Sequence, residues 1–362
     1  MANSLKIATF NVENLFKRAK VFNFSDRKDG DKILAKVDEL RLEFDKKVYD
    51  GKRIFDLYKQ LKDFIEINEV RGKLFKRNRQ FEVIGVKANG KDDWGGFITF
   101  KAADFREITR KNTAKVINSV KADIISLIEV EDKATLDAFN SQLITKKYRY
   151  SMLIDAYDPR GIDVSLLSRL AMRNIGTHMF EKVGRSPIFS RDCLEVEIKV
   201  ADNDFINLFI NHFKSQGYGT STENDAKRLR QTQKVADIIT KERKLDLKND
   251  KVVVLGDFNA TRDNKSLSPL LNLKGLKDVL ELQFPAPNDR WTYHWDKNQQ
   301  IDYILVSEPL QNAFKQAGVE RRGIYDLAKY SNGQETAWPD VQDHGVTASA
   351  SDHGAVWAQF DL

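Results

Sequence analysis

Polar residues that can bind metal ions or exchange protons follow or border several strand-like runs in this sequence. They are Asn11, Glu13, Glu129, Asn211, His212, Asp257, Asn259, Asp302, Asp352 and His353. A packed core does not require such residues, and α/β proteins build their sites at strand ends and in the loops after them. Taken singly, each is more often a turn or cap residue, so the prediction of a site rests on the whole set.

The residue types in this set favour metal-assisted phosphate chemistry. Carboxylate and carboxamide oxygens without thiolates suit Mg²⁺, Mn²⁺ or Ca²⁺. Hydrolysis of a phosphate ester needs such a metal to neutralise the phosphoryl oxygens, a base that orients water, and donors for the remaining oxygens. The sequence therefore predicts phosphoester hydrolysis with a divalent ion, for which these ligands leave Mg²⁺, Mn²⁺ and Ca²⁺ open.

Strand-like runs alternate with helical patterns over most of the chain. The strand-like runs are 5–10, 123–128, 164–167, 194–200, 205–211, 251–255, 300–306 and 355–360. The helical patterns are 109–120, 133–142, 224–243 and 267–273. This mixture predicts an α/β fold packed in layers. Several runs are nearly continuously apolar, which indicates strands covered on both faces and, from the residues alone, a parallel sheet.

Residues 17–110 interrupt this alternation, and we predict that they form a basic, largely helical insertion within one catalytic domain of residues 1–362. Residues 31–53 and 53–70 carry apolar residues at spacings of three and four, which is typical of amphipathic helices. Residues 90–96 are predicted to form a loop.

Positive charge is concentrated in the same part of the chain. Residues 17–120 contain 26 basic and 17 acidic residues, whereas the whole chain has a net charge of +6. The densest basic cluster of the insertion comprises Lys73, Lys76, Arg77 and Arg79. This cluster is either a solvated surface or a surface that binds nucleic acid or phosphate.

Other features of the sequence restrict the class of protein. The single cysteine, Cys193, excludes an internal disulfide and a cysteine-based zinc site, and we predict that it is a buried small hydrophobe. The first residues lack the pattern of a secretory signal, and no stretch approaches the roughly 20 apolar residues of a membrane span. We expect a soluble, cytoplasmic protein.

Seven short motifs occur in the order typical of the endonuclease/exonuclease/phosphatase superfamily, which the chain resembles over residues 5–16 and 109–362. The motifs are Thr9-Phe-Asn-Val-Glu-Asn14, Ile128-Glu-Val130, Arg160-Gly-Ile-Asp-Val-Ser-Leu-Leu167, Asn211-His-Phe-Lys-Ser215, Gly256-Asp-Phe-Asn259, Ile301-Asp-Tyr-Ile304 and Ser351-Asp-His353. The neighbourhood of His212 is most similar to the deoxyribonuclease-like and bacterial nuclease branch. The resemblance implies a four-layer α/β sandwich of two packed, mostly antiparallel sheets flanked by helices, in place of a parallel sheet.

The resemblance also implies a metal site and favours Mg²⁺ or Mn²⁺ in it, although the ligands would accept Ca²⁺. Glu129 would be the principal metal ligand, with Asn11 nearby and Asp352 completing the metal environment. Asp257 and Asn259 would orient the attacking water and the phosphate.

The remaining implied roles belong to groups that contact the phosphate. His353, hydrogen-bonded to Asp302, would act as general acid/base or phosphate donor, because a carboxylate partner fixes the tautomer and favours the imidazolium. His212 would donate to a nonbridging phosphate oxygen. Arg160 and Lys214 would contact phosphate, and Arg160 suits a clamp because its guanidinium is a planar fork.

Three further histidines have competing interpretations. Asp343-His344-Gly345 repeats the pattern at Asp352-His353-Gly354, and we favour the second copy because it leads directly into the terminal strand. His178 is predicted to be a surface or packing residue. His294 lies in an aromatic cluster and either packs or lines a cleft where bases or sugars stack.

Three functions fit these residues. The first is a nuclease acting on DNA or RNA, with DNA favoured as the partner, and the basic segment supports it. The second is a phosphatase or phosphodiesterase acting on a small phosphorylated molecule or a lipid headgroup. It gains weight because an unspecific cytoplasmic nuclease would endanger its own genome. The third is a scaffold that keeps the fold and binds a partner through the insertion.

Overall fold

The chain divides into two compact units in a computed structural model that describes residues 4–15, 19–22, 24, 27–101, 107–158, 161–217 and 219–362. Unit 1 comprises Met1–Phe16 and Arg106–Leu362, and unit 2 comprises Lys17–Phe105.

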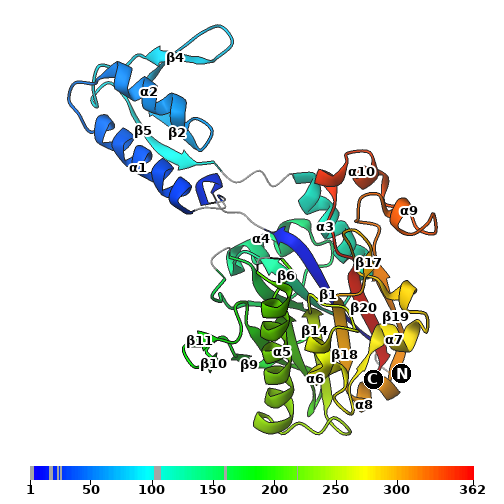
Figure 1. Cartoon of the computed structure of the whole chain (residues 1–362). Coiled ribbons are helices and arrows are strands. Elements are labelled where there is room, and N and C mark those ends of the chain that lie inside the picture. The colour runs from blue at the N-terminus through cyan, green and yellow to red at the C-terminus, as the bar shows by residue number, and fades with distance from the viewer. Residues whose placement is uncertain are drawn as a thin grey trace. The chain divides into compact units, whose positions relative to one another are not determined.

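Two six-stranded sheets form the centre of unit 1 (Figure 1). The first has the order β19 (Phe314–Glu320), β20 (Ala355–Asp361), β1 (Ser4–Leu15), β6 (Ile124–Val130), β8 (Asp163–Ser168) and β7 (Tyr150–Leu153). The second has the order β15 (Lys277–Asp278), β18 (Asp302–Val306), β14 (Lys251–Asp257), β13 (Asp204–His212), β12 (Cys193–Ala201) and β9 (Met172–Thr177). Within these two sheets only the β1–β6 and β13–β14 pairs are parallel.

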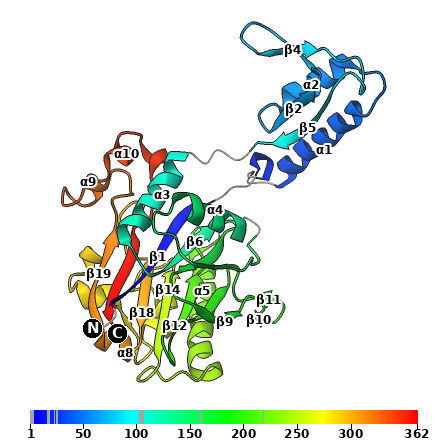
Figure 2. The ribbon, with the colours of Figure 1, turned by 180° about the vertical axis from the view of Figure 1, so that it is seen from behind.

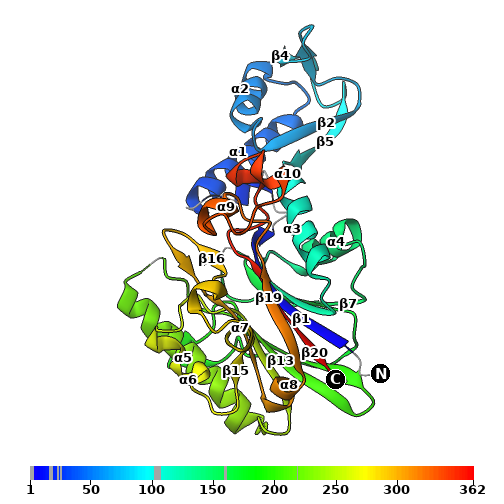
Figure 3. The same cartoon turned by 90° about the vertical axis from the view of Figure 1, so that its right-hand side faces the viewer.

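Helices cover the outer face of each sheet. The first sheet packs against α3 (Glu107–Val120) and α4 (Lys133–Leu143). The second packs against α5 (Ser221–Asp237), the π-helix Ile238–Glu242 and α6 (Ser268–Leu271) (Figure 2, Figure 3). The predicted four-layer sandwich with mostly antiparallel sheets is therefore confirmed.

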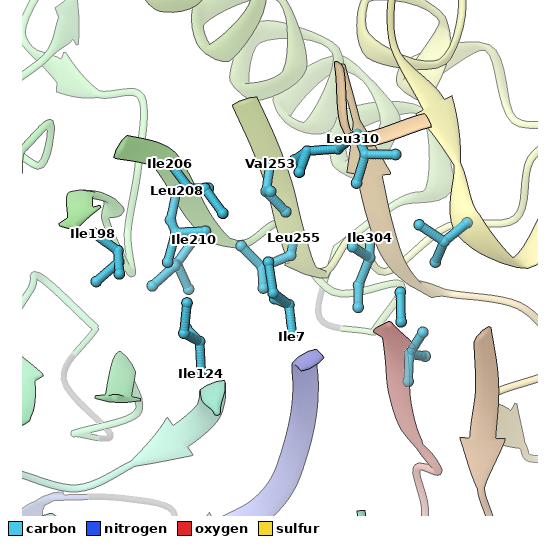
Figure 4. Packing of buried hydrophobic residues seen from close by; sticks show 14 of the residues in the cluster. Ile7, Ile124, Ile198, Ile206, Leu208, Ile210, Val253, Leu255, Ile304 and Leu310 are labelled. Atoms are coloured by element: carbon cyan, nitrogen blue, oxygen red, sulfur yellow. The ribbon is translucent and has the colours of Figure 1, made fainter. Parts of the chain in front are cut away.

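Neighbouring residues on a strand belong to different cores, because successive side chains point to opposite faces of a sheet. Ile7 packs between the two sheets, whereas the next residue, Ala8, packs under the helices of the first sheet. Figure 4 shows Ile7 and Ile124 of the first sheet facing Ile210 and Leu255 of the second. Both faces of each sheet are buried, which explains why the strands read as continuous apolar runs.

Short elements connect these layers. They are β10 (Lys182–Val183), β11 (Ser186–Pro187), α7 (Val279–Gln283), β16 (Tyr293–His294), β17 (Asn298–Gln299), α8 (Glu308–Asn312), α9 (Leu327–Tyr330), α10 (Pro339–Gln342) and the 3₁₀ turns Lys265–Leu267, Pro287–Arg290 and Val346–Ala348. No helix among the described residues is long and apolar enough to cross a bilayer.

Unit 2 has its own core between helices and strands. Helices α1 (Arg27–Phe44) and α2 (Gly51–Leu61) follow the 3₁₀ turn Lys20–Phe22. Strand β2 (Ile65–Arg71) pairs with β5 (Gly95–Phe100), and β3 (Phe75–Arg77) pairs with β4 (Val83–Val86). The buried core residues include Leu40, Ile54, Leu57, Ile67, Phe75 and Trp94.

The four strands of unit 2 differ from the largely helical insertion that the sequence predicts for this region. The predicted helix over 53–70 ends at Leu61, where the Phe64 amide donates to the Leu61 carbonyl at 2.8 Å and the chain turns. Ile65 and Ile67 are then buried and Glu66 is exposed, which is the alternation of a strand. Leu61, Phe64 and Ile65 also satisfy helical spacing, so the pattern alone did not separate the two structures.

Candidate active site

Strand pairing brings six strand ends to one edge of the sandwich. The carboxyl ends of β1 and β6 lie together because these strands are parallel, and β20, antiparallel to β1, begins at the same edge. In the second sheet His212 pairs with Asp257, and Asp257 pairs with Asp302. Residues distant in sequence therefore become neighbours through register.

These strand ends line a cavity of about 900 Å³. The predicted site residues that line it are Asn11, Glu129, His212, Asp257, Asn259, Asp352 and His353. Glu13, Arg191 and Tyr293 line it as well. The predicted contact Arg160 lies outside the described residues.

His353 and Asp302 form a buried hydrogen-bonded pair. The distance from His353 Nδ1 to Asp302 Oδ2 is 2.8 Å, and Thr292 Oγ1 donates to the same oxygen at 2.6 Å. Burial lowers the pKa of His353, but the Asp302 and Asp352 carboxylates raise it, and the net pKa lies well above its usual value. A raised pKa favours the imidazolium form, in which Nδ1–H donates to Asp302 and Nε2–H is a second donor.

Ser351 holds the backbone of this pair against β1. Its hydroxyl donates to the Asn11 carbonyl at 2.7 Å and accepts from the His353 amide at 3.0 Å. One side chain thereby ties the residue before Asp352 to the strand that carries Asn11. The repeated motif has a different position, because His344 is exposed just after α10.

Three carboxylates of the cavity, those of Glu13, Glu129 and Asp352, crowd one another. Glu13 Oε2 accepts from the Asp352 amide at 3.0 Å. Burial, followed by the nearby Asp352 and Glu129 charges, raises the pKa of Glu13 to about 7. Burial also raises the pKa of Glu129, and Asp352 adds to that increase. Such a cluster of like charges would be stabilised by a divalent cation, so the residues present fit one.

Local backbone irregularity places two of these carboxylates. The register of β1 with β6 shifts between Asn11 and Leu15, and that of β6 with β8 shifts between Ile128 and Val130. Within these shifts Glu13 has φ 48° and Glu129 has φ 69°, both in the left-handed region that non-glycine residues rarely adopt. Bulges and strained residues of this kind re-aim side chains at functional sites.

Asp257 lies at the centre of a network of amide donors. Asn11 Nδ2 donates to Asp257 Oδ2 at 3.1 Å, and Asn259 Nδ2 donates to the same oxygen at 3.0 Å. Burial and the Asp302 charge raise the pKa of Asp257 to about 7. His212 Nε2 lies 3.6 Å from Asp257 Oδ2 and 3.7 Å from Glu129 Oε1, so His212 links the carboxylates of the two sheets.

A second grouping places one ligand atom each of Asp257, Asp302 and His353 within 4.8 Å of one another. We interpret this group as a hydrogen-bonded network, because His353 Nδ1 and Asp302 Oδ2 lie at hydrogen-bond distance and a protonated imidazole ring offers no lone pair to a metal. Glu129, Asp352 and Glu13 form another acidic group of the cavity, in which the nearby carboxylate charges raise the pKa of Glu13 and of Glu129. Asn11 Oδ1 already accepts from the Glu13 amide at 3.0 Å.

Two basic residues lie differently from the sequence-based expectation. Lys214 is not among the described residues that line the cavity, and its Nζ donates to the Gly217 carbonyl at 2.7 Å. Arg191, to which no role was assigned, lines the cavity while its guanidinium donates to the Phe213 carbonyl at 2.7 Å. Its place directly before β12, a neighbour of the strand bearing His212, is the one signal in the sequence that points to it.

Glu13 was also missed as a ligand, although it follows the first strand. Asn11 and Glu13 lie two residues apart and would share one face of a regular strand, which is the signal in the sequence that points to Glu13. The register shift and the left-handed backbone at Glu13 are visible only in the structure. His178 contacts Glu195 Oε2 at 3.1 Å, away from this cavity.

A model of the Endonuclease/Exonuclease/phosphatase family matches residues 97–315. A comparison with curated protein sequences gives no match.

Several solved structures resemble the chain at low identity. An endonuclease/exonuclease/phosphatase family protein from Bacteroides thetaiotaomicron matches with 15% identity and a TM-score of 0.54, covering 100% of this chain and 97% of that one. Truncated Caenorhabditis elegans TDP2 matches with 18% identity and a TM-score of 0.49, covering 70% of this chain and 91% of that one. D. rerio TDP2 complexed with single strand DNA product matches with 14% identity and a TM-score of 0.49, covering 72% and 94%. The Bacteroides match shows a shared fold.

Proposed function

Because the chain belongs to the endonuclease/exonuclease/phosphatase family, we propose that it is a metal-dependent phosphodiesterase that cleaves nucleic acid. Membership of this family supports hydrolysis of phosphoesters. The observation that carries the proposal of a nuclease is the His353–Asp302 pair. His353 lines the same cavity as the carboxylates of Glu13, Glu129 and Asp352. A proton donor and a cation site thus face one space large enough for a phosphodiester.

Each residue then has a chemical task. Glu129, Asp352 and Glu13 would hold the divalent ion, which would neutralise charge on the phosphoryl oxygens. Asp302 keeps the His353 ring oriented, so that the imidazolium Nε2 donates to the phosphate or to the leaving oxygen. His212, between the two sheets, donates to a nonbridging oxygen.

Asp257 would orient the attacking water and accept its proton. Asn11 and Asn259 donate to one oxygen of this carboxylate and fix its plane, and its raised pKa makes it a competent proton acceptor near neutral pH. Asn259 N donates to the other oxygen at 2.8 Å, which orients the same carboxylate further.

The distribution of charge favours a polyanionic substrate over a small phosphoester. Residues 17–105 contain 22 Lys and Arg against 16 Asp and Glu, and the rest of the chain contains 37 of each sign. The whole net charge of +6 therefore resides in unit 2, where it would neutralise backbone phosphates. A small phosphorylated substrate gives no reason for such a unit.

Incubation of supercoiled plasmid and of a labelled oligonucleotide with Mg²⁺, Mn²⁺ or EDTA tests this proposal. We expect metal-dependent cleavage that falls at least about a hundredfold in His353→Ala, as for loss of an acid/base group. The matched control is His344→Ala, which alters the exposed copy of the same motif and should cleave as the wild type does. Hydrolysis of inositol or sugar phosphates without any cleavage of polynucleotides would overturn the nuclease and establish the small-substrate enzyme.

A further inference from the structure

A second cavity adjoins the candidate active site. It has a volume of about 1030 Å³, and its lining comes from residues 284–300, Arg321 and residues 329–335. Trp295 and Asp296 line both this cavity and the cavity that contains His353. The tip of the β16–β17 hairpin is therefore the shared border of the two spaces.

The hairpin that carries Trp295 is fixed by side-chain contacts. His294 stacks on Tyr330, with ring centroids 3.7 Å apart and 15° between the planes. His294 Nδ1 contacts Asn298 Oδ1 at 2.7 Å, and Asn298 Nδ2 donates to the Tyr330 carbonyl at 2.9 Å. These contacts pack the His294 ring, which also lines the second cavity, and Trp295 beside it is an aromatic side chain with 77% exposure.

The same hairpin is anchored to the catalytic pair. Tyr293 forms an isolated antiparallel bridge with His353, and their ring centroids lie 4.8 Å apart. Thr292 donates to Asp302, and its carbonyl accepts from the Gly354 amide at 2.6 Å. A group bound on Trp295 is thus held on the element that also positions His353.

An exposed indole costs free energy in water unless something covers it, and a lone exposed aromatic on a fixed platform suits a flat partner. Lysines lie on both sides, since Lys297 lines the first cavity and Lys329 lines the second. Cations that flank an aromatic surface match phosphates that flank a base.

We propose that Trp295 stacks on a nucleobase beside the cleaved phosphate and that the second cavity receives the continuing strand. This inference rests on the proposed function and deepens it, because the substrate becomes an extended single strand. A phosphomonoester or a short diester would leave Trp295 and the second cavity unused.

The test compares a long and a short substrate in Trp295→Ala. We expect kcat/KM for a single-stranded oligonucleotide to fall roughly 5- to 100-fold, as for loss of one stacked base, while hydrolysis of glycerophosphocholine, a short diester without an aromatic ring, falls much less. Trp295→Phe should restore part of the loss. Phe180→Ala, which removes an aromatic side chain at 66% exposure that lines neither cavity, is the matched control for surface hydrophobicity and should leave Trp295-dependent quenching intact.

Fluorescence gives a readout that does not need turnover. In EDTA the oligonucleotide should quench the emission of the wild type, and Trp295→Phe should lose most of that quenching although Trp94, Trp291, Trp338 and Trp357 remain. Equal losses on both substrates, or unchanged quenching in Trp295→Phe, would overturn the stacking role. If the wild type hydrolyses neither substrate, the proposed function fails, and the quenching experiment alone decides whether Trp295 binds a base.

Discussion

At the scale of single residues, the candidate site depends on neighbouring ionisable groups that shift each other's pKa. Asp302 is fully buried, and one of its oxygens binds both His353 and Thr292. Its other oxygen, Oδ1, has no hydrogen-bond partner among the described residues. An ionised carboxylate in this position is tolerable because the imidazolium beside it compensates the charge. The two residues therefore act as a unit.

Replacement of Asp302 by Asn tests this coupling. Asp302→Asn should keep a hydrogen-bonding side chain but remove the charge that holds the imidazolium, so we expect kcat to fall about 10- to 100-fold with a smaller change in KM. Initial rates on the oligonucleotide measure the effect. Asp343→Asn, in the exposed repeat of the motif, is the control, and equal rates in wild type and Asp302→Asn would contradict the role.

Glu13 provides a second prediction at this scale. Glu13→Gln should raise the concentration of Mn²⁺ needed for half-maximal activity by roughly tenfold, because one carboxylate is lost from the proposed ligand set. Mn²⁺ binding measured by calorimetry, without substrate, should weaken in parallel. Unchanged Mn²⁺ affinity in this variant would remove Glu13 from the set and leave Glu129 and Asp352.

At the scale of elements, the ends of strands decide which side chains meet. Asp278 illustrates this away from the site, because it ends β15 and begins α7. Its Oδ1 accepts from the Leu280 amide at 3.0 Å as a helix cap, and its Oδ2 accepts from Gln300 Nε2 at 2.7 Å. Burial raises the pKa of Asp278 to about 6, from a usual value of 3.8.

This shift predicts a pH dependence of stability. The folded state binds the Asp278 proton more tightly than the unfolded chain, so the stabilisation is complete below about pH 4 and is lost as the pH rises through about 6. A shift of this size corresponds to about 3 kcal/mol in the free energy of unfolding. Asp278→Asn keeps a cap acceptor but cannot ionise, so its Tm should decline less than that of the wild type between about pH 4 and pH 7.

Thermal unfolding of both proteins across that range measures the difference. Parallel curves would mean that the Asp278 carboxyl titrates normally in the folded protein. Asp246→Asn is a suitable control, because Asp246 is exposed and its pKa is lowered by hydrogen bonds from Lys248 and Asn249.

At the scale of the whole molecule, charge and catalysis are divided between the two units. Unit 1 contains the cavity and has no net charge, whereas unit 2 carries the excess of positive charge. The β3–β4 hairpin of unit 2 exposes Lys76, Arg79 and Phe81 around an ordered turn. Asn78 holds this turn, because its Oδ1 accepts from the Gln80 and Glu82 amides.

Charge reversal in this hairpin tests its contribution to binding. Lys76→Glu combined with Arg79→Glu should weaken oligonucleotide binding in EDTA and reduce the slope of log affinity against log salt by roughly 1 to 2, as for loss of two phosphate contacts. The control Lys52→Glu with Lys59→Glu makes the same change of net charge on α2, where both lysines contact Asp56. Equal effects in the two double variants would assign binding to net charge alone.

The sequence by itself predicted the family and the layer architecture, and both are confirmed. Strand-end residues such as Asn11, Glu129 and Asp257 are visible in the sequence because polar groups interrupt apolar runs, and seven ordered motifs predict how those runs stack. The hydrogen bond between Asp302 and His353 was likewise expected from the motif order.

Only the tertiary structure decided which neighbours complete the set. Glu13 lies in a register shift with a left-handed backbone, and Arg191 reaches the cavity through strand order. The sequence shows neither feature. The strands of unit 2 and the exposed Trp295 beside His353 also emerge only in three dimensions. The physical reason is that the type and spacing of residues fix the chemistry of a side chain and the face of the element on which it lies. Strand register, bulges and long-range pairing fix which other residues it contacts.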